Sequence, residues 1–178
     1  MPLPTTLMGL DFSCAPSQRK PLTLAVGRRA ASVVRLDRLD TFQTLDAWVQ
    51  VLRAPGEGFV MGCDFPFGLP REAIIDLGWP QTWPALVRHC AALGKPAFRA
   101  ALDAYRESRP VGRRYAHRAT DLPARSHSPL KLVNPPVGLM FLEGGPRLLA
   151  AGVHVPGVHD GDAQRVAIEA YPRAIALE

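Results

Sequence analysis

The chain has 178 residues, of which 47% are hydrophobic and 21% charged, and its formal net charge is +5. This balance excludes disorder over most of the length, and no run of about 18 apolar residues is present to cross a membrane. The three cysteines form no CxxC pair, which argues against a disulfide framework and favours a reducing, cytoplasmic setting. The length suits a single domain over residues 1–178. The final Leu177-Glu178 is of the kind left by cloning, so a truncated native C-terminus stays open.

The basic excess is concentrated in residues 99–131. This segment carries eight basic and three acidic side chains, whereas the rest of the chain holds 13 of each. Such a strip predicts contact with the phosphates of nucleic acid. The candidate nucleic-acid-binding residues in it are Arg113, Arg114, Arg118 and Lys131. A solvated, arginine-rich loop is the alternative.

Three strands are expected first, over residues 6–12, 21–26 and 31–36, because apolar and β-branched residues run or alternate there. Gly27 and the two arginines after it lie between the second and third runs and suggest a hairpin turn. Connections this short favour an antiparallel meander.

Apolar residues take helical spacing over residues 42–52, and Thr41 is the expected N-cap of this helix. The continuous apolar run from Gly58 to Phe65 has the length of a fully buried strand. A helix between two strands suggests a crossover, which places the fourth strand parallel to an earlier one.

Three short helices are expected over residues 70–77, 82–93 and 96–107, with Gly78 and Gly94 ending the first two. Residues 108–131 show no periodicity and predict a long loop of the functional or mobile kind.

A further helix is expected over residues 134–142, ended by Gly144 and Gly145. Strand-like residues 153–155 and 165–171 then flank a polar turn, as a hairpin or as two strands joined by a loop.

Two of the expected strands end in an acid, Asp11 in MGLDFS and Asp64 in MGCDFPFGLP. A charge at the end of a buried strand is unfavourable unless something pairs with it. If these strands are neighbours, their axes lie ~5 Å apart and both carboxylates can contact one Mg²⁺ or Mn²⁺. Glu169 is a third acid in an apolar, strand-like run, and three converging carboxylates would make a phosphoryl-transfer metal site.

Structural roles stay open for each acid. Asp11 could cap the turn that follows it, and Asp64 could organise the turn around its neighbouring prolines and glycine. Glu169 has Arg165 and Arg173 four residues to either side, so it could form a structural salt bridge.

Four segments together resemble the domain of unknown function 429 family, whose members are described as predicted RNase H-like nucleases. They are GLDFS at 9–13, GCDFPFGLPRE at 62–72, RPVGRRYAHRATD at 109–121 and VAIEAYP at 166–172. The resemblance implies an α/β, RNase H-like fold, with a mixed sheet of a three-strand antiparallel meander followed by parallel strands, flanked by helices. It also implies Asp11, Asp64 and Glu169 as catalytic and metal-binding acids.

This sequence departs from the RNase H pattern at two positions. The acid expected on the first helix has only Asp46 as a candidate, and Asp46 has no special context. Glu169 falls on a late strand rather than on a late helix.

The sequence therefore predicts a nuclease that depends on Mg²⁺ or Mn²⁺, with nucleic acid held by residues 99–131 and no membrane partner. A nucleotide phosphotransferase on the same fold is one alternative, although the chain has no glycine-rich phosphate loop. A non-catalytic module that binds nucleic acid or a protein partner, with a vestigial site, is the other.

Overall fold

The computed structural model describes residues 6–172, so the predictions for Arg173 and for Leu177-Glu178 lie outside the described residues. Two compact units make up the chain for which the sequence predicts one domain. Unit 1 comprises Met1–Asp64 with Arg147–Ala170, and unit 2 comprises Phe65–Pro146 with Tyr171–Glu178.

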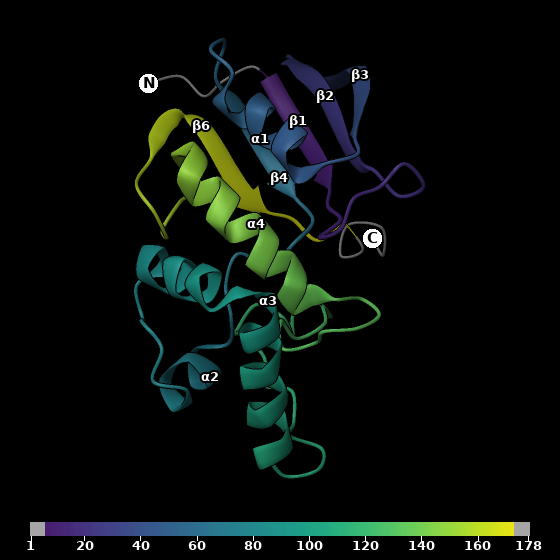
Figure 1. The fold of residues 1–178 in the computed structure, drawn as a ribbon. Helices are drawn as coiled ribbons and strands as arrows, with labels where there is room; N and C mark the ends of the chain where they lie inside the picture. The colour runs from purple at the N-terminus through teal and green to yellow at the C-terminus, as the bar shows by residue number, and fades with distance from the viewer. Residues whose placement is uncertain (1–5, 173–178) are drawn as a thin grey trace. The chain divides into compact units, whose positions relative to one another are not determined.

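Unit 1 is built on a six-stranded mixed sheet in the order β3-β2-β1-β4-β6-β5 (Figure 1). The strands are β1 Thr6–Asp11, β2 Leu22–Ala30, β3 Val33–Phe42, β4 Phe59–Cys63, β5 Val153–His154 and β6 Asp162–Glu169. β1, β2 and β3 pair antiparallel, and β4 and β6 continue the sheet in parallel with β1. The prediction of an antiparallel meander followed by parallel strands is confirmed. β5 and β6 also pair in parallel, so they are two strands joined by a loop and not a hairpin.

Alternation along the strands gives this sheet two different faces. Leu10, Leu24 and Met61 lie on one face and are at most 3% exposed. On the other face Gly9 is exposed and Gly62 is half-buried. Successive strand residues point to opposite faces. The residues two positions after these glycines, Asp11 and Asp64, therefore lie on the more open face.

Helix α1, Leu45–Arg53, connects β3 to β4 and lies against one face of the sheet (Figure 1). It buries Trp48, whose ring meets that of Phe12 edge to face at a centroid distance of 5.5 Å. The expected N-cap Thr41 is wrong, because the ladder between β2 and β3 extends through Thr41 and keeps it in a strand. Thr44 caps the helix instead, and its hydroxyl accepts a hydrogen bond from the Ala47 N–H at 3.2 Å.

The hairpin between β2 and β3 turns at Ala31 and Ser32, not at Gly27 as the sequence suggested. Ala31 takes a positive φ of 55°, which lets the chain reverse there. Gly27 instead lies in β2 beside an irregularity in the register, and a Cβ at this position would collide with the carbonyl of Arg35.

Unit 2 is mainly helical. Helix α2 spans Arg71–Asp76 and α3 spans Trp83–Ser108, while α4, Val137–Ala151, lies partly in each unit. Within α3, Gly94 has non-helical angles, φ 70° and ψ 164°, so the two helices expected around Gly94 are confirmed.

The predicted end of the next helix at Gly144 is wrong, because α4 continues through Gly144 and Gly145. A side chain at Gly144 would collide with the ring of Phe65, so close packing and not a turn explains this glycine. Within residues 6–172, no helix is both long and apolar enough to cross a membrane.

Candidate active site

Asp11 and Asp64 lie side by side at the carboxyl ends of two neighbouring parallel strands. Leu10 of β1 pairs with Cys63 of β4, and the Asp64 N–H donates to the Leu10 carbonyl at 3.0 Å. This bond belongs to the Leu10–Cys63 pair of the parallel ladder. Alternation along the strands directs Asp11, and Asp64 directly after β4, to the side of the sheet that Gly9 and Gly62 share. The structure therefore brings together two of the three predicted acids.

The electrostatics of the pair support this proximity. Burial raises the pKa of Asp64 above its ordinary value, and the negative charge of Asp11 raises it further. Asp64 is half-buried, whereas Asp11 is exposed. Two carboxylates held this way repel each other when both are ionised, and a cation between them relieves that repulsion.

Glu169 ends β6, the other neighbour of β4, but it pairs with Cys63 and not with Asp64. A Cβ at Gly62 would come within 3.3 Å of the Ala170 Cβ, so Ala170 lies on the Gly62 side of the sheet. Alternation then directs Glu169 to the opposite side, where its charge contributes to raising the pKa of the Cys63 thiol, after burial. The third acid thus lies one strand away from the pair and faces away from it.

The salt bridge considered for Glu169 with Arg165 is replaced by other contacts of that arginine. The Arg165 Nε lies 2.8 Å from an Asp162 oxygen, and its Nη1 donates to the Leu52 carbonyl at 2.7 Å. Asp46, the only acid on α1, lies in the first turn of that helix. A carboxylate there interacts favourably with the helix dipole, which is a structural reason for its presence.

The donor set of Asp11 and Asp64 fits Mg²⁺ or Mn²⁺. Among residues 6–172, no group of three or more His, Cys, Asp and Glu residues is placed to hold a metal ion. Magnesium, however, is commonly bound through one or two carboxylates, with waters and substrate phosphates completing its shell. Two nearby carboxylates, with the pKa of Asp64 raised by burial and by the charge of Asp11, therefore suit an ion shared with a substrate.

The two strands that end at these acids repeat one short sequence pattern. Residues 8–11 read MGLD and residues 61–64 read MGCD, and the two methionines, like the two glycines, pair across the ladder. A spacing of two places each glycine on the face of its aspartate. A Cβ at Gly9 would meet only the Ala25 methyl, at 4.0 Å. Gly9 is exposed and has no side chain, so the surface beside the carboxylates is accessible there.

The basic segment belongs to unit 2, and internal hydrogen bonds hold part of it. Asp121 is fully buried and accepts from Arg118, from its backbone N–H at 2.7 Å and from its Nη2 at 2.7 Å. Ser126 donates its hydroxyl proton to the same carboxylate at 3.1 Å. The guanidinium of Arg118, a candidate for nucleic-acid contact, is thereby engaged in a buried ion pair.

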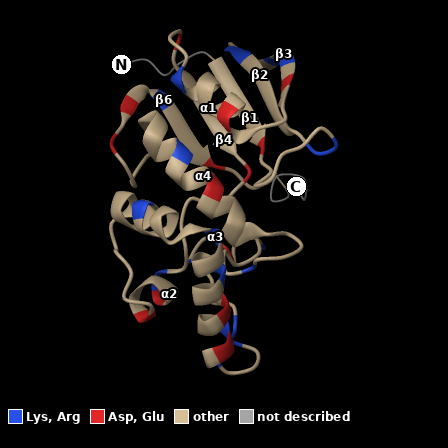
Figure 2. Ribbon diagram, viewed as in Figure 1, with Lys and Arg blue, Asp and Glu red and all other residues tan. Residues whose placement is uncertain are grey.

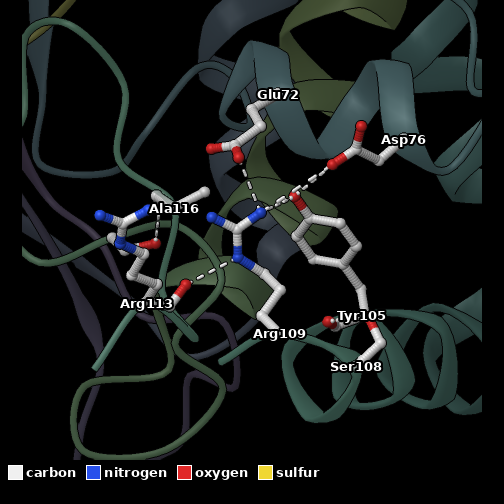
Figure 3. Close-up of polar contacts among 8 residues, drawn as sticks. Glu72, Asp76, Tyr105, Ser108, Arg109, Arg113 and Ala116 are labelled. Atoms are coloured by element: carbon white, nitrogen blue, oxygen red, sulfur yellow. Dashed lines mark hydrogen bonds and ion pairs between the residues drawn. The ribbon is translucent and has the colours of Figure 1, made fainter. Parts of the chain in front are cut away.

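Arg109 connects the start of this segment to helix α2 (Figure 3). Its Nη1 lies 2.8 Å from Glu72 and donates to the Tyr105 hydroxyl at 2.7 Å. The Tyr105 hydroxyl in turn donates to Asp76 at 2.9 Å, and burial together with this hydrogen bond raises the pKa of Tyr105 to about 12. The Nε of Arg109 donates to the Arg113 carbonyl at 2.7 Å, which fixes the backbone at the first candidate arginine.

The remaining candidates for nucleic-acid contact differ in exposure. Arg113 and Arg114 are exposed, and Lys131 is half-buried. Basic and acidic residues both occur along α3 and the chain that follows it (Figure 2). By sequence, unit 1 has nine basic and nine acidic residues, whereas unit 2 has twelve and seven, so unit 2 carries the entire excess of positive charge.

Comparisons with family models, with curated proteins and with solved structures found no match. The resemblance to predicted RNase H-like nucleases therefore stays a prediction. The function has to be argued from the site itself, because a fold alone does not establish an activity.

Proposed function

We propose that the protein is a divalent-metal-dependent phosphodiesterase that hydrolyses nucleic acid, built on an RNase H-like fold. The observation that carries this proposal is the position of Asp11 and Asp64 at the ends of adjacent parallel strands, with the pKa of Asp64 raised by burial and by the charge of Asp11. The sheet order, with a crossover through α1 between β3 and β4, supports the fold that the sequence resemblance implies.

In this proposal Asp11 and Asp64 hold Mg²⁺ or Mn²⁺. The ion, when bound, supplies activation of water and stabilisation of the leaving oxygen. The exposed Gly9 has no side chain to cover the adjoining surface, which allows a sugar-phosphate backbone to approach the carboxylates closely. Glu169 faces Cys63, so we expect it to contribute less than either aspartate.

The test is cleavage of single-stranded and duplex DNA and RNA by the purified full chain, with Mg²⁺, Mn²⁺ or EDTA. Asp11→Asn and Asp64→Asn should each reduce the rate by about a hundredfold or more, because each removes a charged ligand. Glu169→Gln should keep most of the activity. Asp40→Asn is the matched control, since Asp40 lies in β3 and bonds Arg38 on the surface.

Calorimetry with Mn²⁺ alone gives a second readout that does not depend on turnover. The wild type should bind Mn²⁺, and Asp11→Asn should bind it at least about tenfold more weakly. Cleavage that persists in EDTA, or that is unchanged in Asp11→Asn, contradicts the proposal. If the protein binds nucleic acid but neither cleaves it nor binds Mn²⁺, the non-catalytic module is favoured instead.

A further inference from the structure

Unit 2 contains a pocket of about 280 Å³ within the basic segment. It is lined by Tyr115, His117, Ser126, His127, Ser128 and Lys131. All of these residues come from one stretch of unit 2, whereas the carboxylate pair belongs to unit 1. The pocket is therefore a site distinct from the proposed active site in its residues and in its chemistry.

Buried hydrogen bonds build the walls of this pocket. Ser126 is held by the buried Asp121, which also binds Arg118. The Ser128 hydroxyl donates to the Ala116 carbonyl at 2.5 Å and accepts from the Leu130 N–H at 3.1 Å. These contacts hold Ser126 and Ser128, two of the lining residues, in place, so this part of the wall needs little ordering when a ligand binds.

One wall of the pocket is aromatic. The Arg106 guanidinium lies over the Tyr115 ring, 5.1 Å from its centroid, and donates to the Tyr115 hydroxyl at 2.7 Å. This arginine fixes the ring in place. Tyr115 is 43% exposed, which leaves part of its surface accessible to a ligand.

The lining groups select for an anion. Lys131 supplies an ammonium group, His117 and His127 supply imidazoles, and none of the six described lining residues is acidic. A phosphate monoester carries up to two negative charges and three acceptor oxygens, which match such donors. The volume lies just below the ~300–1,000 Å³ typical of sites for drug-sized ligands, so the ligand must be small.

We propose that this pocket binds the terminal phosphate of a small phosphate monoester. A free nucleoside monophosphate and the phosphorylated end of a nucleic-acid strand share this chemistry. Lys131 contacts the phosphate, and Tyr115 packs against the group that the phosphate carries. The proposal does not rest on the Asp11–Asp64 site and holds whether or not the protein cleaves nucleic acid.

The experiment is calorimetric titration of the full chain in EDTA, so that no divalent ion can hold the phosphate. The ligands are inorganic phosphate, a nucleoside 5′-monophosphate, the matching nucleoside, and one oligonucleotide with a 5′-phosphate or a 5′-hydroxyl. We expect saturable binding of the monophosphate and none of the nucleoside. Tighter binding of the 5′-phosphorylated oligonucleotide than of the mononucleotide identifies a strand end as the source, and the reverse order identifies a free nucleotide.

Lys131→Met should weaken monophosphate binding at least about tenfold, and Lys131→Arg should keep most of it, because only the first substitution removes a charge-assisted hydrogen bond. Lys95→Met is the matched control, since Lys95 is an exposed lysine of α3. Equal weakening in Lys95→Met, or none in Lys131→Met, overturns the proposal.

Nuclear magnetic resonance of the wild type covers the case in which Lys131→Met does not fold. The imidazole signals of His117 and His127 should shift on titration with the monophosphate, and that of His154 in unit 1 should not. If neither lining histidine responds at saturation, or if no ligand binds, the pocket is not a phosphate site.

Discussion

At the scale of single residues, the proximity of Asp11 and Asp64 should lower the stability of the metal-free protein and favour the binding of a cation. Partial burial of Asp64 and, to a smaller extent, the negative charge of Asp11 both favour the protonated form of Asp64. Without a cation the folded protein is strained electrostatically at neutral pH, and with one the same proximity becomes a binding site. The pair is thus expected to lower the stability of the metal-free protein.

The pH dependence of unfolding tests this expectation. The folded-state pKa of Asp64 is raised, so the stability it contributes is present below the ordinary aspartate range and is lost as pH rises through the raised value. Asp64→Asn should remove this loss in EDTA and raise the free energy of unfolding at neutral pH by no more than about 1 kcal/mol, since the group is half-exposed and screened. Urea unfolding from pH 3 to pH 8 measures it.

Asp40→Asn serves as the control for this measurement. The Asp40 carboxylate lies 2.9 Å from Arg38 on the surface, so its removal relieves no repulsion and should bring no stabilisation. If Asp64→Asn shows the wild-type pH profile, the two aspartates do not interact in the folded protein as described.

Two of the three acids predicted from the sequence lie together in the structure. An aspartate at the end of each of two apolar strands, with one helix between them, leads directly to Asp11 and Asp64 at one edge of a sheet. The position of Glu169 could not be predicted, because it depends on the register between β6 and β4. A shift of one residue in that register would turn Glu169 toward the pair, and no local pattern specifies it.

At the scale of secondary-structure elements, the glycines show where local reasoning succeeds and where it fails. Gly94 divides α3 because its backbone takes angles that other residues avoid, and that preference is visible in the sequence. Gly144 likewise predicts the end of a helix, yet α4 continues through it. The glycine is explained instead by the Phe65 ring, with which a side chain at this position would collide. The second reason is a tertiary contact, so it cannot be read from the neighbouring residues.

Gly94→Ala is expected to destabilise unit 2. At φ 70° and ψ 164°, a Cβ is strained even though the nearest atom to it, on Pro96, lies 4.0 Å away. The loss of unfolding free energy should be about 1–3 kcal/mol, measured by urea unfolding. Gly68→Ala is the control, because Gly68 has no positive φ and no atom within 4 Å of its Cβ position. Equal stability of both variants would show that Gly94 is not confined to these angles.

At the scale of the whole molecule, charge and carboxylates are divided between the two units. Unit 1 holds the aspartate pair and equal numbers of acidic and basic residues, while unit 2 holds the full positive excess. We therefore expect unit 2 to attract a polyanion, whereas the residues proposed for catalysis belong to unit 1. The proposed binding and the proposed cleavage are thus assigned to different residues, so substitutions can test each separately.

Salt dependence tests whether unit 2 contributes to the proposed nucleic-acid binding. Removing one basic side chain that neutralises a phosphate should lower the slope of log K against log salt concentration by about 0.9 on duplex DNA. Arg113→Ala with Arg114→Ala should therefore weaken binding and reduce the slope by up to about 2, in fluorescence anisotropy titrations with EDTA. Arg19→Ala with Lys20→Ala, an exposed basic pair of unit 1, should leave the slope unchanged. Equal effects of the two double substitutions would mean that net charge alone, and not the basic segment, attracts the nucleic acid.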